Sequence, residues 1–97
     1  MEDNPWPWAS DEKYVPYLEM ERKRYAWVLR TYGDMPAGRA DRAAAERYPY
    51  QPQAAPYRGL VFHTEAWHWA MITLKGELYW TRYPELERPP AEYNELC

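Results

Sequence analysis

The chain has 97 residues, a formal net charge of −3, six tryptophans, ten tyrosines and one cysteine. This length suits one domain, residues 1–97, whose small core must draw much of its buried surface from aromatic side chains. The acidic balance disfavours a general attraction to nucleic acid or anionic lipid, one cysteine excludes an intrachain disulfide, and no apolar run approaches the roughly 20 residues of a membrane helix.

The N-terminal segment, residues 1–15, is predicted to be an extended acidic arm. Its Asn-Pro-Trp-Pro-Trp run cannot start a helix, because proline fixes φ and removes a backbone donor. Trp6 and Trp8 expose a large apolar area in such an arm, so we expect them to dock either on the protein's own core or in a partner's groove. The arm also lacks the basic flank and apolar core of a secretory signal, which together with the single cysteine predicts a cytoplasmic protein.

Two helices are predicted between the arm and the prolines in the middle of the chain. Residues 16–32 carry an apolar stripe at helical spacing, with Pro16 suited to the first turn and Gly33 to the end of the helix. The next segment contains a narrow alanine face that allows close approach to the first helix, and an early glycine places its regular part at residues 39–48. The short loop between the two helices predicts antiparallel or crossed packing.

The second half begins with a proline-rich connector, residues 49–62, which ends in a short apolar plug that could be extended. Residues 63–76 follow, with Thr64 suited to the N-cap and Gly76 to the end of a helix. Because this segment is apolar on nearly all sides, we expect it to be a central helix. The alternative is a β-hairpin over residues 67–81, since Trp, Ile, Thr and Tyr also suit strands.

Residues 78–83 are predicted to form a further short helix that ends before Pro84, and residues 87–97 are predicted to be a loose acidic tail. The sequence therefore favours an all-α protein, a single small domain of about four helices with a proline-rich connector and extended acidic termini. The alternative fold class is α+β, with the hairpin at residues 67–81.

Both histidines lie in one segment with an acid between them, as His63, Glu65 and His68. A helical zinc site of the metalloprotease kind needs its two histidines four residues apart, whereas these are five apart. No metal and no cofactor is therefore predicted, and His68 is expected to pack between tryptophans with one ring nitrogen hydrogen-bonded. Ser10, the only serine, lies in the arm, and Cys97 is the last residue, where nothing preorganises a thiolate. We therefore predict no catalytic residue and expect a non-enzymatic protein without a small-molecule substrate.

Protein binding is the function that the composition favours, because tryptophan, tyrosine and arginine are enriched in interface hot spots. The chain holds more Trp and Tyr than a domain of this size can easily bury. We expect an adaptor, inhibitor or regulator that binds another protein, or a second copy of itself, through an aromatic and arginine-rich surface. The candidate partner-binding residues are Trp6, Trp8, Trp27, Arg24, Arg30, Arg39, Arg42, Tyr50 and Tyr57.

The alternative function is nucleic-acid binding through the basic faces of the helices at residues 16–32 and 39–48. Two helices joined by a short turn, with arginines on the second, are an arrangement that can enter a major groove. However, Asp41 and Glu46 interrupt the second helix, and interleaved charges of both signs are more typical of a solvated, salt-bridged surface.

Overall fold

A computed structural model describes residues 8, 10–55 and 58–96 of the chain, and these residues are helical or irregular, without a strand. The all-α prediction is confirmed, and the alternative hairpin at residues 67–81 is wrong. The helices are α1 (Asp11–Gly33), α2 (Ala37–Arg47), η2 (Leu60–His63), α3 (Ala66–Lys75), α4 (Tyr79–Arg82), η3 (Pro84–Leu86) and α5 (Ala91–Asn94), where η marks a 3₁₀-helix.

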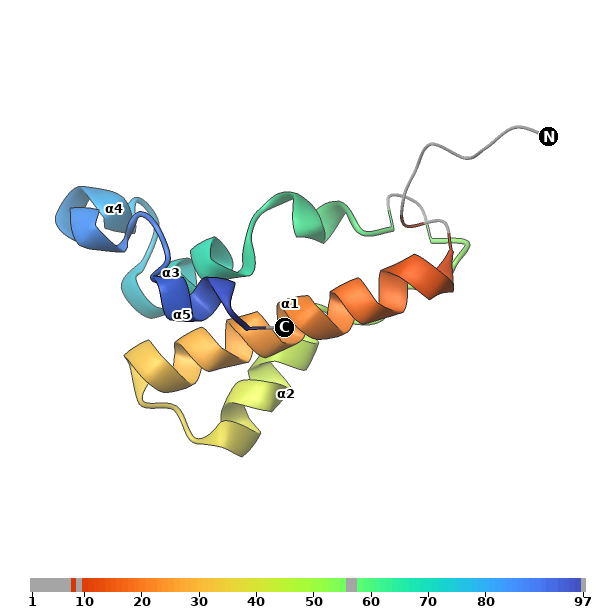
Figure 1. The fold of residues 1–97 in the computed structure, drawn as a ribbon, viewed down its shortest axis with the longest axis horizontal. Helices are drawn as coiled ribbons and strands as arrows, with labels where there is room; N and C mark the ends of the chain where they lie inside the picture. Colours follow the sequence, from red (N-terminus) through yellow and green to blue (C-terminus); the bar gives the residue numbers. More distant parts are fainter. Residues whose placement is uncertain (1–7, 9, 56–57, 97) are drawn as a thin grey trace.

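Helix α1 is the axis of the fold, and α2, α3 and α5 pack against it (Figure 1). Helix α2 folds back along one side of α1, while α3 and α5 lie on another side and α4 projects beyond them. The molecule is elongated, with extents of 49 × 29 × 24 Å. No helix in the described part of the chain is long and apolar enough to span a membrane.

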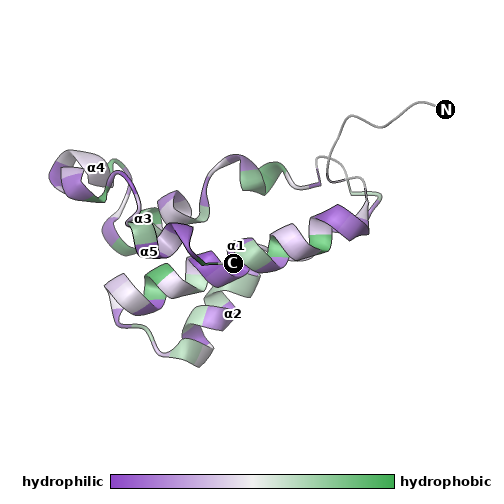
Figure 2. Ribbon diagram, viewed as in Figure 1, coloured by the Kyte–Doolittle hydropathy of each residue, from purple (hydrophilic) through white to green (hydrophobic). Residues whose placement is uncertain are grey.

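The core lies between α1, α2 and α3. Helix α1 contributes a buried stripe that includes Leu18, Tyr25 and Leu29, and α3 contributes Trp67 and Met71. In Figure 2 polar and apolar bands alternate along α1, as expected of a helix that buries only one face. The small residues predicted to let α2 approach α1 do face the core; these are Ala40 and Ala44, which are exposed by 1% or less.

The predicted start of the first helix at Pro16 is wrong, since α1 begins five residues earlier and includes part of the predicted arm. The Ser10 side chain accepts a hydrogen bond from the backbone N–H of Glu12 at 3.1 Å, and Asp11 and Glu12 occupy the first turn, where the helix dipole favours acids. Pro16 therefore lies inside the helix. These start signals outweigh the one hydrogen bond that the proline removes.

Replacing Ser10 with alanine is expected to lower the free energy of unfolding by about 1 kcal/mol, because the N-cap hydrogen bond is lost. Urea unfolding followed by circular dichroism measures the change. The matched control is Ser10→Asp, which keeps a capping oxygen and should retain wild-type stability. Equal stability of the wild type and Ser10→Ala would show that this cap contributes nothing.

Helix α3 begins differently from the prediction. Thr64 is not its N-cap; the N-cap is Glu65, which makes no side-chain capping bond. Instead, the first backbone donors of α3 meet groups of other helices: the Ala66 N–H lies near the buried carboxylate of Glu21 in α1 and lowers its pKa, and Trp67 N–H donates to the Tyr93 hydroxyl in α5 at 3.0 Å. The start of α3 is thus completed by tertiary contacts.

The prediction of a loose tail at residues 87–97 is also wrong for its described part. Residues 91–94 form α5, and Tyr93 is 1% exposed in the core cluster. Leu96 is partly buried against the same cluster. The segment folds back because Tyr93 gains both apolar burial and the Trp67 N–H donor.

The end of the connector forms the 3₁₀-helix η2 rather than the extended plug expected from its sequence. Arg58, just before η2, forms an ion pair with Asp11 at the start of α1, and its guanidinium lies 3.8 Å from the centre of the Tyr14 ring. This pair fastens the connector to the first turns of α1. The short helix predicted at residues 78–83 is confirmed as α4.

A candidate interaction surface

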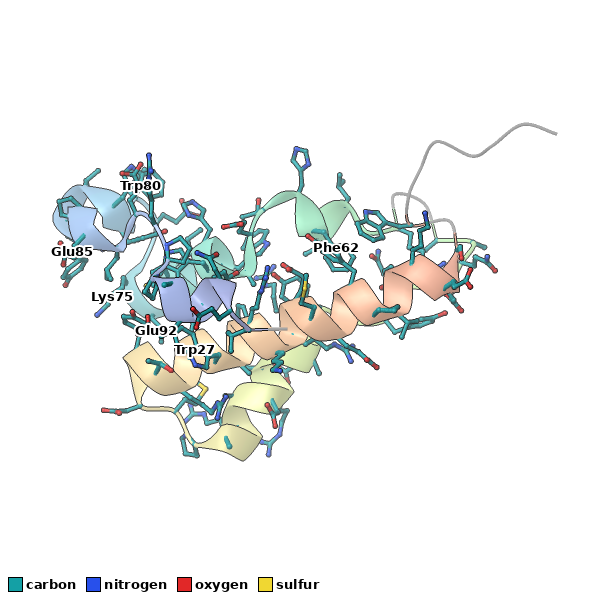
Figure 3. The ribbon with its side chains drawn as sticks, in the orientation of Figure 1. Trp27, Phe62, Lys75, Trp80, Glu85 and Glu92 are labelled. Atoms are coloured by element: carbon teal, nitrogen blue, oxygen red, sulfur yellow. The ribbon has the colours of Figure 1, made fainter. Side chains whose placement is uncertain are left out.

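A small hollow opens between the first turns of α1 and the 3₁₀-helix η2. We call it the aromatic pocket; its volume is about 180 Å³, and its lining residues are Trp8, Tyr17, Gly59, Leu60, Phe62 and His63. Figure 3 shows Phe62 reaching from η2 towards α1. The pocket exists because the Arg58–Asp11 pair brings η2 against α1.

Three rings build the wall of the aromatic pocket. Trp8 lies 4.7 Å from Tyr17 and 5.1 Å from Phe62, and Tyr17 lies 4.8 Å from Phe62, between ring centres. All three pairs are tilted or edge-on, which is the preferred geometry of aromatic contacts. Trp8 also rests on Gly59, where φ is +83° and any side chain would collide with the indole. Trp8 therefore docks on its own chain, one of the two alternatives foreseen for the arm.

The pocket presents unused hydrogen-bonding groups beside its rings. Neither the Trp8 indole N–H nor the Tyr17 hydroxyl has a hydrogen-bonding partner within residues 8, 10–55 and 58–96, and neither atom is sealed in the interior. Burial, followed by the nearby Glu21 carboxylate, raises the pKa of Tyr17, so this hydroxyl keeps its proton at neutral pH and can donate. Leu60 stands at the rim with 52% of its surface exposed.

The other predicted aromatic contacts are placed differently. Tyr50 is 49% exposed, but its hydroxyl donates to Asp11 at 3.1 Å and its ring packs on Tyr14. Trp27 is partly buried, and its ring packs against Tyr32 of α1 and Tyr93 of α5. Figure 3 shows Trp27 below α5. Trp6 and Tyr57 lie outside the described residues.

The four predicted partner-binding arginines do not come together. Arg24 is largely buried, 3.8 Å from Glu21 and stacked over the Tyr93 ring. Arg30 lines a groove between α1 and α2, whereas Arg39 and Arg42 line a separate hollow together with Met35 and Glu46.

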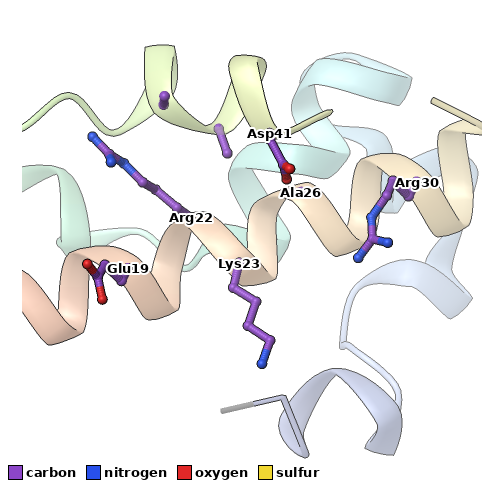
Figure 4. A pocket seen from close by; sticks show the side chains of 8 residues that line it. Glu19, Arg22, Lys23, Ala26, Arg30 and Asp41 are labelled. Atoms are coloured by element: carbon purple, nitrogen blue, oxygen red, sulfur yellow. The ribbon is translucent and has the colours of Figure 1, made fainter. Parts of the chain in front are cut away.

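The α1–α2 groove is the hollow that contains Arg30 (Figure 4). Its volume is about 310 Å³, its cations are Arg22, Lys23 and Arg30, and its acids are Glu19 and Asp41. Alanine residues of both helices supply its apolar lining. With three cations against two acids, the groove carries almost balanced charge.

A buried polar cluster lies where α1, α2, α3 and α5 meet. Its centre is Glu21, which is 2% exposed, and burial raises the pKa of this carboxyl from 4.5 to about 7 although Arg24 opposes the shift. The Tyr48 hydroxyl and Nε of Arg24 are buried nearby without a hydrogen-bonding partner in the described part of the chain. Burial and the Glu21 charge raise the pKa of Tyr48, which keeps it protonated.

The two histidines do not converge. Nδ1 of His68 is 2.9 Å from the Tyr79 hydroxyl, and its ring stacks on Trp80 at an interplanar angle of 21°, so its expected packing role is confirmed with one tryptophan instead of two. His63 is exposed at the aromatic pocket. Among the described residues, no group of three or more His, Cys, Asp or Glu side chains could hold a metal ion.

Sequence reasoning selected Trp8 but missed the other walls of the pocket. Tyr17 follows Tyr14 by three residues, and this helical spacing is a signal that α1 starts before Pro16. Leu60 and Phe62 were expected as a core plug, and only the packing of η2 shows that one side of it stays open. Comparison with protein-family models, curated proteins and solved structures gives no significant match for this chain.

Proposed function

We propose that this protein is a non-enzymatic binding protein that holds another polypeptide at the aromatic pocket. The observation that carries the proposal is a ring-walled hollow with the half-exposed Leu60 at its rim. Tryptophan and tyrosine at such positions give large contact area at little cost in side-chain entropy. The partner is thus expected to insert a side chain between the rings.

The size of the aromatic pocket favours a side chain over a free small molecule. Pockets for drug-sized ligands and cofactors span roughly 300–1,000 Å³, whereas this one measures about 180 Å³. A hollow of this size suits one residue of a larger partner, with further contacts made on the surrounding surface. The nucleic-acid alternative gains less support, because Arg30 lines one hollow, Arg39 and Arg42 line another, and both hollows also contain acids.

A photo-crosslinking residue placed at position 60 is expected to give a discrete covalent adduct with a partner protein in the native cell. The matched control is the same residue at position 78, because Leu78 is equally exposed, at 57%, but lies at the far end of the molecule before α4. Gel electrophoresis and mass spectrometry of the adducts measure the outcome.

The adduct from position 60 should disappear when Trp8 is changed to alanine, provided that circular dichroism shows an unchanged helical fold. The same adduct from position 78, or an adduct insensitive to Trp8→Ala, would contradict a role for the aromatic pocket.

A further inference from the structure

We infer that a second copy of this chain docks on the α1–α2 groove, with the α1 helices of the two copies antiparallel across a twofold axis. The inference goes beyond the proposed function, because the groove shares no lining residue with the aromatic pocket. Three features of the groove carry it: a floor of small residues, exposed charges without ion pairs, and an order of charges along α1 that complements its own reverse.

Small side chains form the floor of the groove. Ala26 of α1 and Ala44 of α2 are exposed by 3% and 1%, and the exposed Ala45 completes the apolar lining. The side chains at a helix–helix contact set the distance between the two axes, and alanine allows a short one. A helix of a second molecule can therefore come close enough for the charged side chains at the rims to reach across.

The rims carry charges that the chain itself does not pair. Four exposed side chains line the groove without an ion pair to any other described residue: Glu19, Lys23, Arg30 and Asp41. The fifth charged side chain, Arg22, is used internally, since its Nε donates to the Tyr48 carbonyl at 2.8 Å. The four that remain are two acids and two cations. They offer opposite charges to a copy of the same surface, and they give little attraction for a polyanion such as nucleic acid.

The order of the charges along α1 selects the antiparallel arrangement. Glu19 and Arg30 are separated by about three helical turns, so they share one face of α1 and lie at opposite ends of the groove (Figure 4). A twofold axis midway between them places Glu19 of each copy opposite Arg30 of the other. A parallel pairing would instead set Glu19 against Glu19 and Arg30 against Arg30, which is repulsive at both ends.

The same axis also pairs the other two charges. Lys23 and Ala26 lie at equal distances on either side of it, so Lys23 of one copy faces Ala26 of the other. Asp41 reaches from α2 towards Ala26, and both line the groove (Figure 4). Lys23 of each copy therefore meets Asp41 of the other, and all four unpaired charges gain a partner of opposite sign.

Sedimentation equilibrium of the full-length protein between about 10 μM and about 1 mM tests the inference. In about 50 mM sodium chloride the wild type is expected to change from monomer to dimer across this range, because the contact is small and its ion pairs stay near solvent. In about 500 mM sodium chloride the dimer should be severalfold weaker, because salt screens such pairs.

Charge exchange tests the proposed pairing directly. Arg30→Glu should weaken the dimer about tenfold, because the twofold axis turns two opposite pairs into like pairs, and Glu19→Arg should do the same. The double variant Glu19→Arg/Arg30→Glu exchanges the two charges and should associate like the wild type. The matched control Arg39→Glu changes the net charge as Arg30→Glu does but lies in a separate hollow, so it should leave the dimer unchanged. Circular dichroism checks that each variant keeps its helices.

Three outcomes overturn the inference. The wild type stays monomeric over the whole concentration range; Arg39→Glu weakens the dimer as strongly as Arg30→Glu; or the double variant associates no better than the single variants. The position-60 adduct reports on the aromatic pocket alone, so its result and the result of the charge exchange stand separately.

Discussion

The free energy of unfolding of the wild-type protein is expected to fall as the pH rises from about 5 to about 8, by up to about 3 kcal/mol. Glu21 is the cause, because burial raises the pKa of its carboxyl from 4.5 in the unfolded chain to about 7 in the folded protein. Between these two values the folded protein holds a proton that the unfolded chain has released. The folded state is thus favoured at the acidic end of this range, and the advantage is lost as the pH passes 7. Urea unfolding at both pH values measures the difference.

The groups around Glu21 come from every helix that packs on it. Arg24 and Tyr17 lie on α1, Tyr48 follows α2, and Glu65 and Tyr93 belong to the starts of α3 and α5. Arg24 and, more weakly, the Ala66 N–H favour the charged carboxylate, and together they do not cancel the effect of burial.

The matched variant for this prediction is Glu21→Gln, which keeps the shape and an acceptor for Ala66 N–H but cannot ionise. Its stability should be nearly independent of pH over the same interval and should exceed that of the wild type at about pH 8. A wild-type protein that is equally stable at both pH values, or a variant with the same pH dependence as the wild type, would contradict the assignment to Glu21.

Trp67→Ala is expected to lower the free energy of unfolding by about 3–5 kcal/mol, a large share of the total for a domain of this size. The indole is 1% exposed, its ring centre lies 5.3 Å from Tyr32 and 5.6 Å from Tyr93, and its N–H donates to the Leu86 carbonyl at 2.8 Å. The variant therefore loses apolar burial, ring contacts and a hydrogen bond that ties α3 to η3. Thermal and urea unfolding measure the loss.

Trp69→Ala, two residues further along α3, is the matched control. Trp69 is only partly buried, and Arg47 stacks on its ring from α2 at 4.3 Å. A clearly smaller loss is expected there, because less apolar surface returns to water. Similar losses at both positions would mean that the centre of the core is not at Trp67.

The helices could be predicted largely because their endings are local signals. Gly33 is the last residue of α1, Gly76 directly follows α3, and Pro84 comes two residues after the end of α4. The start of α1 is wrong in the prediction because it rests on Pro16 and takes no account of the Ser10 cap. A proline is tolerated inside a helix when burial on the opposite face stabilises the helix on both sides of it.

The buried polar cluster could not be found by composition, because Glu21 sits among charged neighbours that are mostly exposed. Its position does carry a signal: Glu21 falls between Leu18 and Tyr25 at helical spacing, on the apolar stripe itself. The aromatic pocket, by contrast, depends on where η2 packs against α1, and no local pattern in residues 58–63 encodes that distant contact.

The hydrogen bond from Trp67 N–H to Tyr93 has a consequence for the order of events during protein synthesis. Helix α3 receives one of its first acceptors from a residue that the ribosome adds 26 positions later. Until Tyr93 has left the exit tunnel, the nascent chain holds Trp67 without the ring that covers it. Folding of this domain is therefore delayed until after residue 93 emerges, and chaperones would meet the most apolar helix in its uncovered form.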